Sequence, residues 1–175
     1  MPGRPLPFEV VTCAQETRPI LATGGLSINP KYHLDNCPIP EILVVPGGWG
    51  TREQLSNGTL MAWLRTTAPQ CQIVLSVCTG ALLLAKAGLL DGLGATTHRE
   101  AIDLLQLLAP SARVRRFERF IDNGQIVVAA GITAGLDAAL HVVERLLGSP
   151  VAQATAEYLE WDSARGNGKT RSDWT

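Results

Sequence analysis

The chain has 175 residues, of which 46% are hydrophobic and 18% charged, and its formal net charge is −1. This length and apolar content are expected to give one compact domain with a sizeable core. The near-neutral charge and the lack of a long basic run argue against nucleic acid or an anionic membrane surface as a partner. No stretch is apolar over the length that a bilayer span requires, and the first ten residues lack the apolar core of a signal peptide. We therefore expect a cytoplasmic protein.

The cysteine pattern agrees with that location. The four cysteines are widely spaced, with no CxxC motif and no Cys/His cluster. Without an export signal, free thiols are expected rather than disulfides. No metal-ligand spacing, phosphate-binding loop or dinucleotide fingerprint occurs, so neither a metal nor a cofactor is expected.

In chain order, the first predicted elements are strands. Residues 8–13, FEVVTC, predict one strand, and residues 18–29 predict a hairpin that turns at a Gly-Gly pair. Residues 41–48, EILVVPGG, form a continuous apolar run that ends in proline and glycine, which is typical of a parallel strand buried on both faces. A short helix is predicted over 59–67.

The second half of the chain continues the alternation. Residues 72–77 predict a fully apolar strand, and the helix predicted over 79–90 is apolar nearly all round, so it should be buried. The remaining patterns predict a strand within 91–98, a helix over 99–108, two strands within 113–131 that meet at an Asp-Asn-Gly turn, and helices over 136–147 and 151–161. Strands alternating with helices indicate an α/β fold, an open parallel sheet with helices on both faces. We expect it to occupy residues 1–163, followed by a flexible tail at 164–175.

Cys78 stands where the second buried strand must turn sharply into a helix, in the sequence QIVLSVCTGALLL. Such a turn strains its central residue and needs small neighbours, which Ser76 and Gly80 provide. A lone cysteine between apolar segments is more often an inert buried side chain. We accept that interpretation for Cys13, Cys37 and Cys71, but not for Cys78.

The position of Cys78 also predicts its chemistry. A thiol at a helix N-terminus meets the positive end of the helix dipole, which favours the thiolate. Both Cys78 and the pair Gly47–Gly48 follow buried strands, and ligands bind beyond the carboxyl ends of parallel strands. The amide of Thr79, together with the amides near the glycine pair, is then expected to hold a developing negative charge.

Three segments of the sequence resemble the ThiJ/PfpI superfamily, which has the class I glutamine amidotransferase-like fold. They are ILVVPGGWGTR, SVCTGALLLAKAGLLDGLGATTH and AAGITAGLDAALHVVERLLG, in that order. Within the superfamily, the CTGA…AGLLDG…ATTH pattern is most similar to isonitrile hydratases and to the sensor domains of AraC-type regulators. The resemblance implies a flavodoxin-like sheet.

The resemblance also implies roles for individual residues. It makes Cys78 the nucleophile and Thr79 its partner in the site, and it places Gly47 and Gly48 in the oxyanion-binding pocket. His98 matches a histidine that can face the site, and the alternative is a histidine that caps the start of a helix.

Other side chains near these motifs leave the site less defined. Trp49 either walls a pocket or covers the sheet. Arg99 replaces an aromatic residue that is common in the family, which changes the shape of the pocket, and Thr79 replaces the histidine of the superfamily's proteases, so peptidase activity is not expected. An exposed i,i+4 pair with Asp137 explains His141.

Family members usually begin with a further central strand, a loop that bears Asp or Glu, and a helix. Here the matching segment starts at residue 6, so the family's general acid has no counterpart in the motifs. Glu16, Glu41 and Glu53 lie in other contexts, and none is assigned this role. A later start or a trimmed chain, a partner chain that fills the gap, or a sheet that closes around a shorter core would each explain the difference.

Three functions therefore remain open from the sequence. The first is an isonitrile hydratase-like lyase in which Cys78 attacks a small electrophilic substrate. The second is a non-catalytic small-molecule sensor domain, and the third is deglycase- or glyoxalase-like chemistry with the same thiolate. An inactive protein that keeps the fold without the site is a further alternative. The resemblance implies a homodimer.

Overall fold

The computed structural model describes residues 7–161. The chain divides into two compact units, Met1–Ile39 and Pro40–Thr175, and each has its own strands. The tail expected at 164–175 lies outside the described residues, and a single domain over 1–163 stays a prediction. Among residues 7–161, no helix combines the length and the apolar character that crossing a bilayer requires.

The first unit is built from two-residue strands. β1 (Cys13–Ala14) runs parallel to β4 (Tyr32–His33), and β2 (Ile20–Leu21) forms an antiparallel hairpin with β3 (Ser27–Ile28). The predicted hairpin is confirmed, and the glycines at its turn have φ angles of 92° and 88°, which side chains rarely adopt. A 3₁₀ turn, η1 (Leu34–Asn36), follows β4.

The strand predicted over residues 8–13 is wrong except at its last residue. Only Cys13 of this segment lies in a strand, and Val10 is 86% exposed. Aromatic and β-branched residues favour a strand only where a partner strand and a face to pack against are present. Of residues 8–14, only Cys13 and Ala14 have a partner strand among the described residues.

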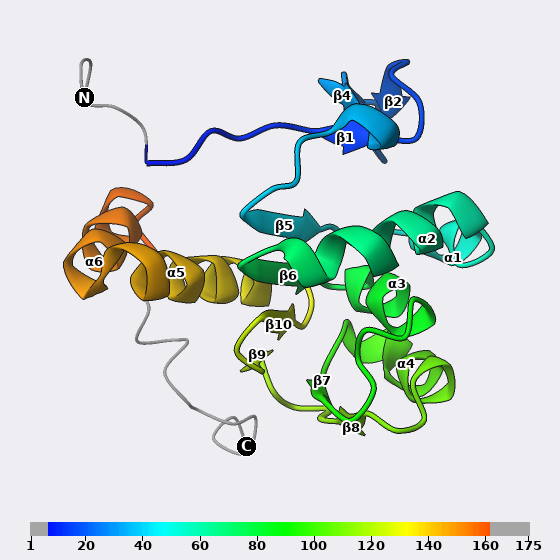
Figure 1. Ribbon diagram of the computed structural model, residues 1–175. Coiled ribbons are helices and arrows are strands. Elements are labelled where there is room, and N and C mark those ends of the chain that lie inside the picture. Colours follow the sequence, from blue (N-terminus) through cyan, green and yellow to red (C-terminus); the bar gives the residue numbers. More distant parts are fainter. Residues whose placement is uncertain (1–6, 162–175) are drawn as a thin grey trace. The chain divides into compact units, whose positions relative to one another are not determined.

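The second unit contains a four-stranded sheet in the order β5-β6-β10-β9 (Figure 1). Its strands are β5 (Ile42–Val45), β6 (Ile73–Val77), β10 (Ile126–Ala129) and β9 (Phe120–Asp122). The first three are parallel, and β9 is antiparallel to β10, so the strands predicted over 41–48 and 72–77 and the hairpin turn are confirmed. β7 (Gly94–Ala95) and β8 (Arg113–Val114) form a separate parallel pair.

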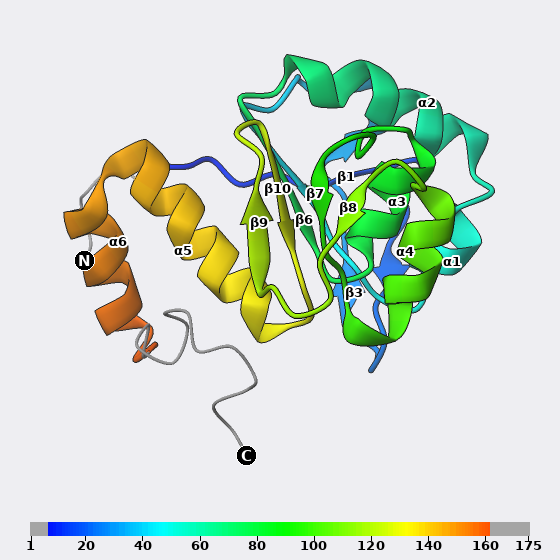
Figure 2. The same ribbon diagram turned by 90° about the horizontal axis from the view of Figure 1, so that it is seen from below.

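Helices cover both faces of this sheet. Figure 2 shows α5 (Thr133–Leu147) on one side of β9, β10 and β6, and α3 (Gly80–Lys86) and α4 (Ile102–Leu108) on the other. The side chains of β6 alternate accordingly: Val74 packs in the core under α3, and Ile73 and Leu75 pack in the core under α5. The open α/β architecture expected from the sequence is therefore confirmed.

Shorter elements complete the second unit. Around the sheet lie α1 (Thr51–Gln54), α2 (Gly58–Thr67), α6 (Ser149–Tyr158) and the 3₁₀ turns η2 (Ala68–Gln70) and η3 (Arg99–Ala101). The helix predicted over 59–67 is confirmed as α2. The helix predicted over 79–90 is shorter, because Gly88, with φ of 76°, follows its end.

β5 is the last strand on its side of the sheet among the described residues. The carbonyl of Glu41 accepts a hydrogen bond from the N–H of Ile73. The backbone N–H and C=O groups of every second residue, which are Glu41, Leu43 and Val45, therefore point toward β6. Those of Ile42 and Val44 consequently face away from the sheet. Leu43 is buried, but Val44 is 53% exposed on the other face. A parallel strand is normally covered on both faces, so this edge has the features of a sheet that accepts a further element.

Asp122 ties the β9–β10 hairpin to α5. Its carboxylate accepts hydrogen bonds from the N–H of Gly124 at 2.7 Å and from Arg145 at 3.1 Å, and it lies 2.7 Å from Nε2 of His141. The expected pair of His141 with Asp137 is wrong, because Asp137 is paired instead with Arg119 and Trp161. Burial alone would raise the pKa of Asp122, but these partners outweigh it and lower the pKa below its usual value.

Replacing Asp122→Asn is expected to lower the free energy of unfolding at neutral pH by about 1–3 kcal/mol, because charge-assisted hydrogen bonds are lost. The lowered pKa in the folded state stabilises the protein above the ordinary carboxyl value of 3.8, and this stabilisation disappears as the pH falls through the folded-state pKa. The deficit of the variant should therefore shrink in acid. Urea unfolding at neutral pH and near the folded-state pKa measures both effects.

The matched control is Asp103→Asn. Asp103 also pairs with an arginine, Arg116, but its side chain is 93% exposed. Its replacement should change stability by less than about 0.5 kcal/mol. Equal losses in the two variants would contradict the role given to Asp122.

Candidate functional site

Cys78 occupies the turn between β6 and α3. Its φ angle is 55°, in the left-handed region that non-glycine residues seldom adopt. The N–H of Cys78 donates to the carbonyls of Ala129 and Ala130 at 3.1 and 3.0 Å, and its carbonyl accepts a 2.8 Å hydrogen bond from the hydroxyl of Thr97. Neighbouring segments on the β10 side thus hold the strained residue in place, as the sequence predicts for a sharp strand-to-helix turn.

Two glycines allow the end of β5 to approach this turn. A Cβ atom at Gly47 would lie 2.7 Å from the amide nitrogen of Thr79 and 2.8 Å from Cβ of Cys78. A Cβ atom at Gly80 would lie 2.2 Å from the carbonyl oxygen of Val45. All three distances are shorter than any van der Waals contact, so the segment after β5 and the Cys78 turn lie directly side by side, as expected.

Ser76 plays the part expected of a small neighbour. It is fully buried in β6, and its hydroxyl has no hydrogen-bond partner among residues 7–161. Its contribution to the turn is therefore its small volume rather than a polar contact.

Thr79 holds the loop after β5 through its side chain. Its hydroxyl accepts a hydrogen bond from the N–H of Gly48 at 2.9 Å and lies 3.0 Å from the carbonyl of the same residue. The hydroxyl of Thr51 donates to that carbonyl at 2.8 Å. The Gly48 amide is thus engaged by Thr79 and is not free for an oxyanion here. The N–H of Thr79 has no acceptor among residues 7–161 and lies against Gly47, so it is available for that role.

The structure places His98 at the start of η3. Its Nδ1 accepts a hydrogen bond from the N–H of Glu100 at 3.4 Å, which is the helix-capping alternative. The ring also packs against Gly131, where a Cβ atom would lie 2.6 Å from Cδ2 of the imidazole. His98 therefore supports the Ala130–Gly131 segment, whose first carbonyl binds the amide of Cys78.

Trp49 extends from the loop that follows Gly48. Its side chain is 71% exposed, and the guanidinium of Arg52 lies 5.2 Å from the centre of its ring. The indole therefore does not cover the sheet, and its cation–π contact fixes it at the rim of the Gly48 loop.

The hydrogen bonds around Cys78 involve backbone groups and threonine hydroxyls; among residues 7–161, none of those described for Cys78, Thr79 or Gly48 involves a carboxylate. Nor do three or more His, Cys, Asp or Glu side chains gather there into a metal-binding group in this part of the chain. The described site therefore supplies a thiol and an amide donor, without an acid.

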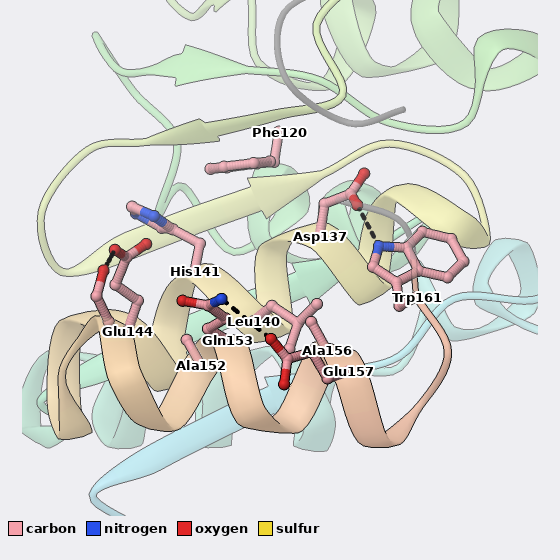
Figure 3. Close-up of a pocket in the computed structure, with 11 residues that line it drawn as sticks. Phe120, Asp137, Leu140, His141, Glu144, Ala152, Gln153, Ala156, Glu157 and Trp161 are labelled. Atoms are coloured by element: carbon pink, nitrogen blue, oxygen red, sulfur yellow. Dashed lines mark hydrogen bonds between the residues drawn. The ribbon is translucent and has the colours of Figure 1, made fainter. Parts of the chain in front are cut away.

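A cavity of about 560 Å³ lies elsewhere, between β9, α5 and α6 (Figure 3). No sequence motif marks it, although all its lining residues lie between Phe120 and Trp161. Its polar side chains pair with neighbours: Asp137 with Arg119 and Trp161, His141 with Asp122, Glu144 with Ser149, and Gln153 with Glu157. These pairs satisfy the polar groups of the cavity, and none of the predicted site residues lines it.

A cysteine in a left-handed turn at the carboxyl edge of an open α/β sheet has the backbone geometry of a nucleophile elbow. The chain belongs to the DJ-1/PfpI family, whose sequence profile matches residues 5–145. This family is the ThiJ/PfpI superfamily that the motifs resemble.

Several relatives are similar to most of this chain. It is 36% identical over 146 residues to an isonitrile hydratase of Pseudomonas putida, a match that covers 83% of this chain and 63% of the relative. It is 33% identical over 139 residues to the HTH-type transcriptional regulator CdhR of Pseudomonas aeruginosa, covering 79% of this chain and 41% of the regulator. The chain thus spans less than two thirds of the length of either relative.

Solved structures of the same fold agree. A ThiJ/PfpI family protein from Pseudomonas syringae superimposes with a TM-score of 0.77 at 31% identity, covering 86% of this chain and 63% of that structure. An AraC family transcriptional regulator from Pseudomonas putida gives a TM-score of 0.75 at 25% identity, covering 87% of this chain and 82% of the other. The flavodoxin-like fold is therefore shown.

Replacing Gly80→Ala should destabilise the protein by about 1–3 kcal/mol or more, because the new methyl group meets the backbone of β5 and cannot be moved aside by a side-chain rotation. The matched control is Gly58→Ala at the start of α2, where a Cβ atom meets nothing within 4 Å. There, alanine should be neutral or stabilise by up to about 1 kcal/mol. Thermal unfolding compares the two variants, and similar melting temperatures would contradict the close approach.

Proposed function

We propose that this protein binds a small electrophilic molecule beside Cys78 and that its chemistry is isonitrile hydration. The observation that carries the proposal is the left-handed Cys78 between β6 and α3. Next to it lies the amide of Thr79, which has no acceptor among residues 7–161. The similarity to an isonitrile hydratase over 83% of the chain supports the choice of substrate class.

The reaction has two steps at this thiol. The Cys78 thiolate adds to the terminal carbon of the isonitrile, and that carbon takes a proton, which gives a thioimidate. Water then attacks the same carbon, the nitrogen is protonated, and the C–S bond breaks to return the thiol and release an N-substituted formamide. The Thr79 amide is placed to stabilise negative charge that develops beside the sulfur.

The first step needs a proton donor that the described residues around Cys78 do not supply. We therefore expect efficient turnover only when an acid from outside the described residues reaches the site. Reading the gene upstream of the codon for Met1 is a direct test: an in-frame strand, a loop bearing Asp or Glu, and a helix would supply the acid.

The second candidate is a small-molecule sensor that does not turn its ligand over. The observation that favours it is the hydrogen-bond network of the elbow, in which residues 7–161 place no carboxylate, together with the similarity to transcriptional regulators. Deglycase- or glyoxalase-like addition to a carbonyl remains a third alternative with the same thiolate. A homodimer and a cytoplasmic location belong to the same proposal.

Hydration is measured by following the loss of the isonitrile infrared band of an aryl isonitrile and the appearance of its formamide by mass spectrometry. Cys78→Ala should abolish protein-dependent formamide formation, whereas Cys71→Ala should retain it, because Cys71 is buried and donates to the carbonyl of Thr67. Binding that protects Cys78 from alkylation without any formamide would favour the sensor. Formamide at equal rates with Cys78→Ala would exclude the nucleophile.

Cys13, Cys71 and Cys78 should differ in the rate at which iodoacetamide labels them at neutral pH. Burial raises the pKa of Cys71, and burial together with the adjacent Cys37 raises that of Cys13 to about 11. Half-buried Cys78 should therefore be labelled before both, and labelling of Cys13 should increase as the pH rises toward its pKa. Peptide mapping after brief labelling distinguishes the sites. Labelling of Cys78 no faster than that of Cys71 would contradict an activated thiol.

A further inference from the structure

The backbone of the first unit brings Cys13 and Cys37 together. Cys13 lies opposite Tyr32 in the parallel β1–β4 pair, and the next residue of β4 is His33. One 3₁₀ turn, η1, leads from His33 to Cys37, which caps the end of that turn. Reciprocal hydrogen bonds hold the turn in place: the His33 ring accepts from the backbone of Asp35, and the side chain of Asn36 accepts from the backbone of His33.

The two thiols lie close enough to influence each other. Burial together with the neighbouring Cys37 raises the pKa of Cys13 to about 11. Both side chains are half-buried rather than enclosed, so a small reagent in solution can reach them. The thiol of Cys37 also contacts the carbonyl of Pro38 at 3.5 Å, which orients its sulfur.

The unit that contains this pair has little core to stabilise it. Between residues 7 and 39, only Pro30 and Leu34 are buried, and each strand has two residues. Leu21 and Leu26, on either side of the hairpin turn, are 73% and 68% exposed. Small units with so few buried residues usually depend on a cross-link or on a partner.

We propose that Cys13 and Cys37 form a reversible disulfide that staples β1 to the end of η1 and encloses the β2–β3 hairpin and β4. This assigns a redox modification site to two cysteines whose sequence contexts indicated inert thiols. It is independent of the function proposed for Cys78, because it uses other residues in the other unit.

A low-molecular-weight disulfide such as oxidised glutathione is the oxidant. The Cys37 thiolate attacks one sulfur of glutathione disulfide, the S–S bond breaks, and one glutathione leaves as a thiol. The Cys13 thiol then loses its proton and attacks the Cys37 sulfur of the mixed disulfide, which releases the second glutathione. The protein loses two hydrogen atoms, and the oxidant becomes two thiols. Because Cys13 holds its proton more tightly, it acts as the resolving thiol, and alkaline pH should speed the second step.

The remaining cysteines provide an internal comparison. Cys71 is 3% exposed and donates to the carbonyl of Thr67, and Cys78 lies in the turn before α3. No hydrogen bond of Cys71 or Cys78 in the described part of the chain involves a second thiol. The folded protein should therefore form one specific intramolecular pair.

The test equilibrates the full chain in glutathione buffers of graded oxidised-to-reduced ratio, quenches it with acid and alkylates the free thiols. We expect an intact mass lowered by two hydrogen atoms and a peptide linking Cys13 to Cys37, both reversed by dithiothreitol. Limited proteolysis between these residues should be about tenfold slower, or more, in the oxidised protein, because the cross-link restricts local opening.

Cys13→Ser and Cys37→Ser each leave one partner and should retain a glutathione on it instead of closing a ring. Cys71→Ala should form the Cys13–Cys37 link as the parent chain does. The proposal is overturned if the folded chain yields no Cys13–Cys37 peptide at any glutathione ratio. It is equally overturned if the pair forms no more readily in folded protein than in urea, since the native contact would then play no part.

Discussion

The site depends on a close contact between the backbone at the end of β5 and the backbone of the Cys78 turn. This contact is possible because two of its residues are glycines, which have no side chain. Gly47 and Gly80 let the end of β5 lie against the turn between β6 and α3, at distances where a Cβ atom would overlap backbone atoms. This contact places the Gly48 loop within reach of the Thr79 hydroxyl, which binds both polar groups of that glycine. Without it, the turn would have support only from the β10 side, through Ala129, Ala130 and Thr97.

That support on both sides explains how Cys78 remains in a left-handed conformation. A non-glycine residue in this region costs on the order of 1–3 kcal/mol, which the surrounding hydrogen bonds must offset. The N–H of Cys78 is shared between two carbonyls, and its own carbonyl is bound by Thr97. The strain is therefore local, and the groups that offset it are two backbone carbonyls and the hydroxyl of Thr97.

The parts of this arrangement that depend on local sequence could be predicted, and those that depend on distant partners could not. Apolar runs bounded by glycine and proline identified β5, β6 and the position of Cys78. Burial on both faces explains the continuous apolar pattern of β6, whereas Val44 on one face of β5 is 53% exposed. The strand expected over residues 8–13 failed because its composition cannot show whether a partner lies beside it. Sequence spacing paired His141 with Asp137, but tertiary packing brings Asp122 to it across the hairpin instead. The contact between Cys13 and Cys37 was missed for the same reason, because β1 and β4 are far apart in the chain.

The outer edge of β5 lies on the side of the Cys78 turn from which a proton donor could approach the thiol. On the β10 side, Ala129, Ala130 and the segment packed on His98 already occupy the approach to Cys78. On the other side stands β5, whose outer backbone groups at Ile42 and Val44 face no strand among the described residues. A strand added there in parallel would end at the same edge as β5 and β6, and a residue following it would lie beside the Gly47 loop. An acid that follows such a strand would therefore lie on the Gly47 side of Cys78.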